Sequence, residues 1–230
     1  MPSPPTTNDQ GPEDQPPADR PPAGQGPQEQ PGPDPFANVV FDSHRGGDAY
    51  PPFLEAFRSL QDAVTRSDPP PAVWAQLTEK VQAAVDLLGP FAAPERTQPA
   101  GTRLDLPGRG SPMLLPLVVD EESRDHLLGH ITFRRFHLGG NGAAHGGTIA
   151  LLFDEALGRL ANIGRRTIAR TAYVKINYRS ITPIEVELRL EGSVDSEEGR
   201  KRFLTGRLYD GDTLVADAEG LFVALLPGQP

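Results

Sequence analysis

Hydrophobic and polar residues alternate through much of the C-terminal half of the chain. Val186, Leu188, Leu190 and Val194 fall on one side of an extended strand, and the charged residues Glu187, Arg189 and Glu191 lie between them. Short turn-forming segments join the last three such stretches, which predicts an antiparallel meander. Six strands are expected, near 113–119, 130–136, 167–178, 184–194, 200–209 and 213–226.

A single, strongly apolar helix is predicted from about residue 145 to residue 162, between the second and third strands. The segment 137–144, which precedes it, is rich in glycine and is expected to form a loop. One long apolar helix among six antiparallel strands is typical of an α+β fold. We therefore predict a curved sheet wrapped around a central helix.

The N-terminal half has a different pattern. Apolar residues recur at helical spacing between 51 and 89, and three consecutive prolines at 69–71 divide this stretch in two. We expect a helical hairpin packed on the main domain, with Trp74 as its anchor, followed by a linker. The predicted organisation is an N-terminal tail (1–35), a helical hairpin with its linker (36–112) and the main domain (113–230).

Composition separates the tail from the rest of the chain. Residues 1–35 contain 12 of the 26 prolines and no Ile, Leu, Val, Phe, Trp or Tyr, so a disordered segment is predicted. Six acids and one arginine give this tail a charge of −5, which leaves −4 of the total of −9 for the remaining residues. A charge balance of this kind argues against nucleic-acid binding, which needs a concentrated basic surface.

The absence of cysteine excludes disulfides, thiolate nucleophiles and Cys-ligated metals. The first ten residues have neither a basic nor an apolar region of the kind found in signal peptides. The longest apolar runs, such as 148–153, are too short for a membrane span. We expect a soluble, cytoplasmic protein.

The stretch 139–154, GGNGAAHGGTIALLFD, is the most informative segment for chemistry. Gly146 and Gly147 fall at the start of the predicted helix, where backbone N–H groups have no intrahelical acceptor and the helix dipole adds partial positive charge. Such amides can stabilise a developing oxyanion. Asp154 lies two turns further on and shares its helix face with small residues only (Ala150, Gly158 and Ala161).

Asp154 is the better catalytic candidate of two adjacent acids, because Glu155 lies one turn before Arg159 and is expected to pair with it. Each signal also has a plainer interpretation. A carboxylate in an apolar helix often turns to solvent or meets an arginine. Glycines before a helix are more often simple turns than anion sites. From the residues alone, both interpretations stay open.

The run His145–Asp154 resembles the signature of the hotdog thioesterases of the phenylacetate-pathway and acyl-CoA thioesterase superfamily. In that family an HGG sequence opens the central helix, and an Asp nine residues after the His carries the chemistry. The later segments 175–178, 182–183 and 198–201 are similar to long-chain acyl-CoA thioesterases of the C-terminal-modulator type. The resemblance spans about 113–227 and implies a hotdog fold.

The resemblance implies a homodimer, with dimers that can pair into tetramers, and active sites at the dimer interface. The amide of Gly147 or Gly146 would polarise the thioester carbonyl, and Asp154 of the other subunit would activate water or attack directly. Thr171 would help to hold the water. His145 has three possible roles: placing the loop through its backbone, which we favour, donating to the carbonyl, or capping the helix.

Coenzyme A carries phosphates, so its site needs basic side chains and amides. The resemblance places such contacts on Asn177, Arg179 and Arg200, and Lys201 follows directly in the sequence. A charged hairpin is equally typical of a solvated sheet edge. Strict alternation predicts that Thr171 and Asn177 share a polar face of their strand.

The sequence departs from some relatives at one position, where they place an Asn six residues before the motif His. Gly139 occupies that position here, and the nearest asparagine is Asn141.

The predicted function is hydrolysis of acyl-CoA thioesters to a free acid and CoA, in fatty acid metabolism, without a metal or redox cofactor. The alternative is a non-catalytic dimer that binds acyl-CoA or acts as a scaffold. A hotdog hydratase is disfavoured, because that chemistry usually needs a His shortly after the Asp and no His follows His145.

Overall fold

The computed structural model describes residues 44–229 except Arg165. The tail predicted at 1–35 lies outside the described residues, as does the beginning of the segment 36–112. Among the described helices, none is long and apolar enough to cross a membrane.

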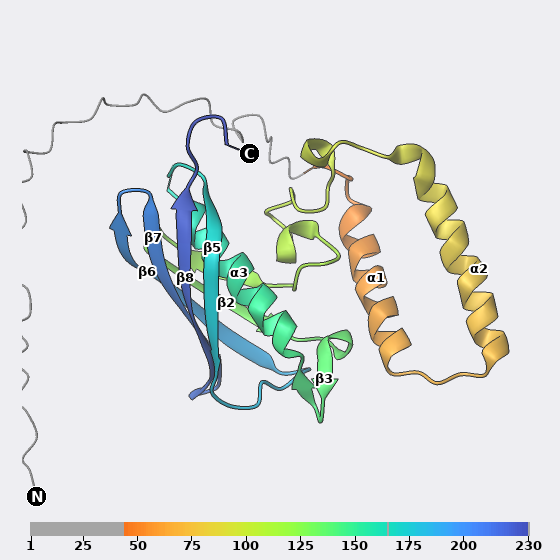
Figure 1. Cartoon of the computed structure of the whole chain (residues 1–230). Coiled ribbons are helices and arrows are strands. Elements are labelled where there is room, and N and C mark those ends of the chain that lie inside the picture. The colour runs from red at the N-terminus through yellow and green to blue at the C-terminus, as the bar shows by residue number, and fades with distance from the viewer. Residues whose placement is uncertain (1–43, 165, 230) are drawn as a thin grey trace, which may run out of the picture. The chain divides into compact units, whose positions relative to one another are not determined.

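Six strands form one antiparallel sheet in the order β1-β2-β6-β7-β8-β5 (Figure 1). The consecutive pairings β6–β7 and β7–β8 confirm the predicted meander. Strand β5 pairs only with β8 and is one edge of the sheet, while β1 is the other. The strands are β1 (Val118–Glu122), β2 (His126–Thr132), β5 (Ala169–Tyr178), β6 (Glu187–Glu198), β7 (Lys201–Asp210) and β8 (Thr213–Ala224).

Helix α3 (Gly146–Asn162) lies against one face of this sheet (Figure 1). Phe153 and Leu157 of α3 are almost completely buried, and they pack where the facing strands carry glycine. A Cβ atom at Gly206 would lie 2.8 Å from the Phe153 ring, so only glycine allows the sheet to approach the helix so closely. The predicted α+β arrangement, a sheet around one central helix, is confirmed.

The first two strands differ from the prediction: the second, expected near 130–136, is β2 (His126–Thr132). Residues 113–117 form an irregular segment, although Leu114, Leu115 and Leu117 are buried in it. The first strand begins only at Val118. The apolar residues of this segment therefore correctly indicated that it is buried but not that it forms a strand. A buried loop needs apolar side chains just as a buried strand does. The glycine-rich loop holds a small hairpin of β3 (Leu138–Gly140) and β4 (Ala143–Ala144).

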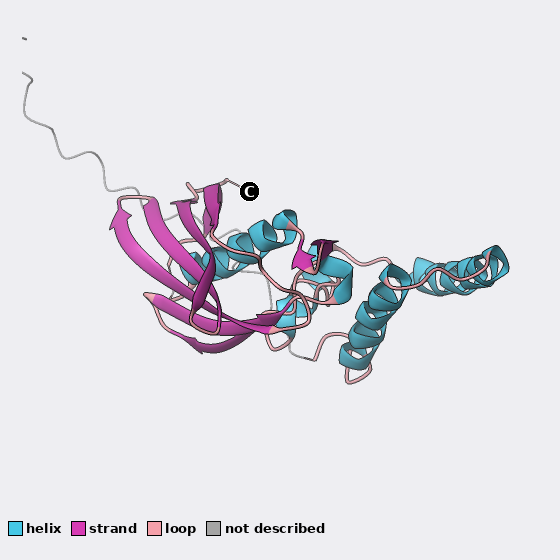
Figure 2. Ribbon diagram, turned by 90° about the horizontal axis from the view of Figure 1, so that it is seen from below, coloured by secondary structure: helices cyan, strands magenta, loops and turns pink. Residues whose placement is uncertain are grey.

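The predicted helices are present, as α1 (Tyr50–Thr65) and α2 (Pro71–Leu88). Helix α1 docks through buried Leu54 and Arg58, and Arg134 donates from the main domain to Asp62 (2.8 Å). Helix α2 has no buried residue, and it lies on the far side of α1 from the sheet (Figure 2). The expectation that both helices pack on the main domain, with Trp74 as anchor, is therefore wrong for α2. Short 3-10 helices complete the chain: η1 (Gly89–Phe91), η2 (Glu95–Thr97), η3 (Pro107–Gly110) and η4 (Arg135–His137).

Candidate active site

The start of α3 is organised by His145, which is the N-cap residue. Its Nδ1 accepts a hydrogen bond from the Gly147 amide (3.0 Å), and its carbonyl accepts one from the Thr148 amide (2.9 Å). The His145 amide donates to the carbonyl of His137 (2.8 Å). His145 therefore both caps the helix with its side chain and fixes the preceding loop through its backbone.

The Gly146 amide is the open donor at this helix end. Within residues 44–229, leaving aside Arg165, it has no hydrogen-bond acceptor. The Gly146 carbonyl accepts from the Tyr178 hydroxyl at the end of β5 (2.9 Å). Of the two predicted amides, the structure thus leaves Gly146 available and occupies Gly147 with the His145 ring.

Buried His137 also stabilises this loop. Burial lowers the pKa of His137 to about 4, so the ring is neutral near pH 7. Its Nδ1 accepts from the Arg134 amide (2.8 Å), and the Phe133 ring meets it edge-on. The histidine is one of the loop's structural supports, and its place beside the motif could not be read from its spacing.

The departure at Gly139 has a steric basis. A Cβ atom there would lie 2.7 Å from the Cα atom of His145, so no side chain fits without a backbone shift. Asn141 is exposed and has a left-handed backbone (φ 49°) in the turn between β3 and β4. This turn is where an asparagine is expected, since its side chain tolerates that conformation.

Asp154 lies on the wall of a cavity of about 460 Å³. Its Oδ1 accepts a hydrogen bond from the Thr171 hydroxyl (2.8 Å), which fixes the carboxylate between α3 and β5. Asp154 is exposed in the single chain. The Asp154 cavity is lined by Leu104, Arg109, Glu122, Asp154, Glu155, Gly158, Arg159, Asn162, Ile163, Ile168, Ala169, Arg170, Thr171 and Phe222.

The predicted pair of Glu155 with Arg159 is wrong. Both carboxylate oxygens of Glu155 accept from Arg109 (2.6 and 2.9 Å), and Arg159 donates to Glu122 of β1 (2.7 and 3.1 Å). An ion pair one turn apart on a helix stabilises the helix by only about 0.2–0.5 kcal/mol. The bidentate ion pair of Glu155 with the half-buried Arg109 is stronger, and it therefore forms instead.

Thr171 and Asn177 lie on opposite faces of β5, so the prediction from strict alternation that they share a polar face is wrong. The pairing with β8 slips between Thr171 and Tyr173, which leaves Ala172 as an extra residue. Thr171 lies opposite buried Phe222, on the α3 side, whereas Asn177 lies opposite Asp217 on the outer side. One bulged residue inverts the alternation of a strand, and this explains the error.

The four predicted CoA contacts fall into two separate groups. Asn177 and Arg179 both donate to Asp217, and the Arg179 guanidinium, with Asn177 adding to it, lowers the pKa of that carboxyl. Arg200 donates to the Ala224 carbonyl (3.0 Å) at the other end of β8, and Lys201 is exposed beside it. Asp217 and Ala224 are seven residues apart, about 23 Å along an extended strand.

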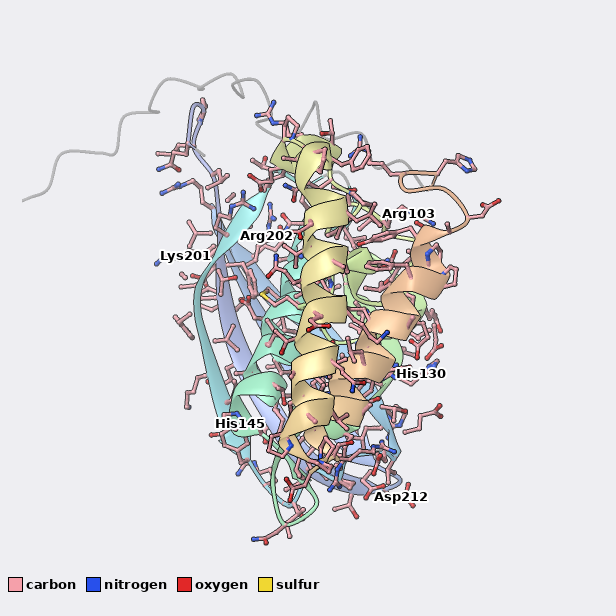
Figure 3. The ribbon with its side chains drawn as sticks, turned by 90° about the vertical axis from the view of Figure 1, so that its right-hand side faces the viewer. Arg103, His130, His145, Lys201, Arg202 and Asp212 are labelled. Carbon is pink, nitrogen blue, oxygen red and sulfur yellow. The ribbon has the colours of Figure 1, made fainter. Side chains whose placement is uncertain are left out.

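Figure 3 shows Lys201 far along the sheet from His145, the residue that caps α3 next to Gly146. A single chain therefore does not gather these four residues into one site.

Gly146 and Asp154 are also apart within one chain. They are eight residues apart on one helix, which amounts to about 12 Å along its axis. One thioester carbonyl cannot contact both groups of the same helix. As for metals, the described part of the chain contains no cluster of three His, Cys, Asp or Glu residues that could hold an ion.

Comparison with known proteins identifies the family. Residues 141–216 match the model of the thioesterase superfamily, and this range includes every predicted site residue. This match covers about a third of the chain and relates residues 141–216 to the thioesterase superfamily. The fold is that of a solved thioesterase superfamily protein, with a TM-score of 0.67 and 27% identity over 77% of this chain and 96% of the other. This likeness covers about 177 residues, so it extends N-terminal of residue 113.

Two curated relatives are acyl-coenzyme A thioesterases named THEM4. The protein of Bos taurus is 35% identical over 88 residues, which are 37% of this chain and 35% of the relative. The protein of Mus musculus is 33% identical over 91 residues, 39% of each chain. The chain thus spans less than two fifths of the length of these thioesterase superfamily relatives.

Proposed function

We propose that this protein hydrolyses acyl-CoA thioesters to a free acid and CoA. The observation that carries the proposal is the Asp154 carboxylate, held by Thr171 on the wall of a cavity of about 460 Å³. This volume falls within the roughly 300–1000 Å³ typical of small-molecule sites. The similarity to two acyl-coenzyme A thioesterases supports the choice of substrate.

The proposed active site is shared between two chains that pair through β5. An antiparallel pairing of two β5 strands sets the start of one beside the end of the other. Thr171, next to Asp154, lies near the start of β5, and Tyr178, bonded to Gly146, lies at its end. The dimer therefore brings Asp154 of one subunit toward Gly146 of its partner. Within one chain these two residues are about 12 Å apart along α3, so they cannot act on the same thioester carbonyl.

In the proposed reaction the thioester carbonyl oxygen accepts from the Gly146 amide at the positive end of α3. In the first route Asp154 takes a proton from a water molecule that attacks the carbonyl carbon, and the carbon–sulfur bond breaks to give the acid directly. In the second route an Asp154 oxygen bonds to the carbonyl carbon, the carbon–sulfur bond breaks, and water then hydrolyses the resulting mixed anhydride to the free acid and the Asp154 carboxylate. In both routes the CoA thiolate leaves and takes a proton. After a single turnover in heavy-oxygen water, unlabelled acid together with label in Asp154 would show the anhydride route.

The same dimer shortens the distance between the two groups of CoA candidates. Arg200 and Lys201 flank the start of β5 through β8, and Asn177 and Arg179 lie at its end. Antiparallel β5 strands place the first group of one subunit across the interface from the second group of its partner. The phosphates of CoA would then lie along this edge.

Asp154→Asn tests the proposal directly. Loss of the carboxylate should lower kcat by about 100- to 10,000-fold, the usual contribution of general acid–base catalysis. CoA release can be followed with a thiol-reactive dye, and the chain has no cysteine to react with it. Turnover of the variant at the wild-type rate would remove Asp154 from the mechanism.

Asp195→Asn is the matched control. Asp195 also accepts from a threonine hydroxyl, that of Thr205 (3.0 Å), but it is exposed outside the cavity. The control should keep wild-type turnover.

A non-catalytic dimer that binds acyl-CoA and recruits a partner is the second candidate. The exposed apolar side chains of α2, among them Val81, Val85 and Leu88, favour it. Binding of several acyl-CoAs by the wild-type chain without release of CoA would support this function over hydrolysis.

A further inference from the structure

Residues 101–110, here called the strap, form a wall of the Asp154 cavity that lies outside the family match at 141–216. Two strap residues line the cavity, Leu104 and Arg109. The Leu104 side chain is 41% exposed, which is unusual for a leucine in a segment whose neighbours Thr102 and Arg103 are buried. An apolar side chain at this place is available to a ligand.

Three consecutive strap residues have a backbone conformation that is energetically unfavourable for residues other than glycine. Gly108, Arg109 and Gly110 all have positive φ (63°, 53° and 68°). A Cβ atom at Gly108 would lie 2.5 Å from the Leu115 carbonyl oxygen, so glycine is required there. Arg109 is not a glycine, and a side chain in this region costs about 1–2 kcal/mol. An arginine in a backbone conformation that suits glycine points to a role for its side chain.

The Arg109 side chain ties the strap to α3. It donates through Nε and Nη2 to both oxygens of Glu155 (2.6 and 2.9 Å), the residue that follows Asp154. The Glu155 side chain is only 14% exposed, so the pair is partly shielded from solvent. The Arg109 carbonyl also accepts from the Gly101 amide (2.9 Å), which closes the strap on itself.

Helix α1 holds the strap from the other side. The Tyr50 hydroxyl donates to the Gly110 carbonyl (2.6 Å), and buried Arg58 donates to the Pro107 carbonyl (3.1 Å). Figure 3 shows Arg103 of the strap beside α1. Because both α1 and α3 fix the strap, Leu104 is positioned over the cavity by a rigid support.

Beyond Asp154 the cavity has an apolar part, although Glu122, Arg159 and Arg170 also line it. Along α3 its floor is the stripe Asp154, Gly158 and Asn162, about 12 Å long. Gly158 contributes no side chain, so space remains over the helix. The walls around this stripe come from Ile163, Ile168, Ala169 and Phe222, together with Leu104. Such a surface suits an alkyl chain.

We propose that Leu104 determines which acyl group the enzyme accepts, with Arg109 as the positioning residue that holds it over the cavity. The favoured substrate is an unbranched acyl chain of medium length, lying along the stripe from Asp154 to Asn162. This inference rests on the proposed thioesterase function. It assigns a role in specificity to the segment before the family match.

The test is a kcat/KM profile over a series of straight-chain acyl-CoAs, from acetyl-CoA to palmitoyl-CoA. Leu104→Trp fills the cavity, so it should lower kcat/KM for medium-chain esters by at least about tenfold relative to acetyl-CoA. Leu104→Ala should shift the optimum toward longer chains. Met113→Trp is the matched control, since Met113 is 70% exposed and does not line the cavity.

Arg109→Gly tests the positioning role. The change relieves the left-handed backbone but leaves the partly buried Glu155 carboxylate without its partner, so the melting temperature should fall, and KM should rise more for medium-chain esters than for acetyl-CoA. An unchanged chain-length profile in Leu104→Trp would overturn the inference while leaving the thioesterase function intact. If the wild-type chain released CoA from no ester, the proposed function itself would fail.

Discussion

The two edge strands of the sheet, β1 and β5, differ in length, charge and neighbours. Strand β1 has five residues, of which Asp120, Glu121 and Glu122 are acidic. Strand β5 has ten residues and no acid, and its exposed side chains include Tyr173 and Tyr178. Short, charged edges resist pairing with other chains, whereas long edges with aromatic residues favour it. The comparison supports the proposed dimer, in which β1 stays unpaired and β5 pairs with a second subunit.

The site residues follow the same division. Thr171 and Tyr178 near the two ends of β5 contact the two parts of α3 that carry the proposed chemistry, Asp154 and Gly146. On the other side, Glu122 of β1 forms an ion pair with Arg159 of α3. In the proposed dimer the β5 edge both pairs with a second chain and positions the proposed catalytic groups, which is why the single chain would hold an incomplete site.

The largest effect on dimer stability is expected from a charge placed in the middle of β5. Tyr173→Asp sets two like charges close together across an antiparallel pair of β5 strands, and it removes two aromatic side chains from the interface. The dimer should weaken by at least about tenfold, or roughly 1.4 kcal/mol, and activity per chain should fall with it at low concentration. Analytical ultracentrifugation measures the first effect and CoA release the second.

The same change on the other edge is the control. Val118→Asp adds a charge to an exposed residue of β1 and should leave the dimer unchanged. Equal weakening by both substitutions would show that β5 is not the interface.

The largest effect on turnover, with the dimer kept intact, is expected from two inactive variants and their mixture. Gly146→Pro removes the open amide at the first residue of α3, where proline fits the helix, and the extended backbone of His145 (φ −63°, ψ 132°) tolerates a following proline. Alone it should lower kcat by about 100- to 1000-fold, as loss of an oxyanion-hole donor does. Gly146→Ala is the control, because it adds a side-chain carbon atom but keeps the backbone N–H.

Mixing Gly146→Pro chains with Asp154→Asn chains should restore about a quarter of wild-type activity, because half of the dimers then carry one intact site. Co-expression with two affinity tags isolates the mixed dimers, which should have about half of wild-type activity. A mixture no more active than its parents would show that each site is formed within one chain.

The smallest effect is expected at β1. Glu122→Ala removes the ion pair with Arg159, whose side chains are 36% and 25% exposed. Partly exposed pairs of this kind contribute about 0.2–1 kcal/mol. Chemical denaturation should show a loss of that size in the free energy of unfolding, with no change in dimer stability. A loss above about 2 kcal/mol would mean that this edge is held more firmly than its exposure suggests.

Local patterns predicted the elements that depend on neighbouring residues. The spacing of apolar residues placed α3 within one residue of its observed start, and turn-forming segments placed the β6–β7–β8 meander. The position of Asp154 on a face of small residues was also readable, because helix periodicity alone fixes it. The segment 113–117 was misread as a strand, since buried loops and strands share apolar side chains.

The sequence by itself determined the fold class, the glycine-rich start of α3 and the candidate carboxylate, all of which follow from periodicity and local backbone freedom. Only the tertiary structure decided that Arg109 binds Glu155, that the Gly147 amide is capped by His145, and that a bulge at Ala172 separates Thr171 from Asn177. The physical reason is distance along the chain. Arg109 and Glu155 are 46 residues apart, and one extra residue in a strand inverts its faces without leaving a mark in composition.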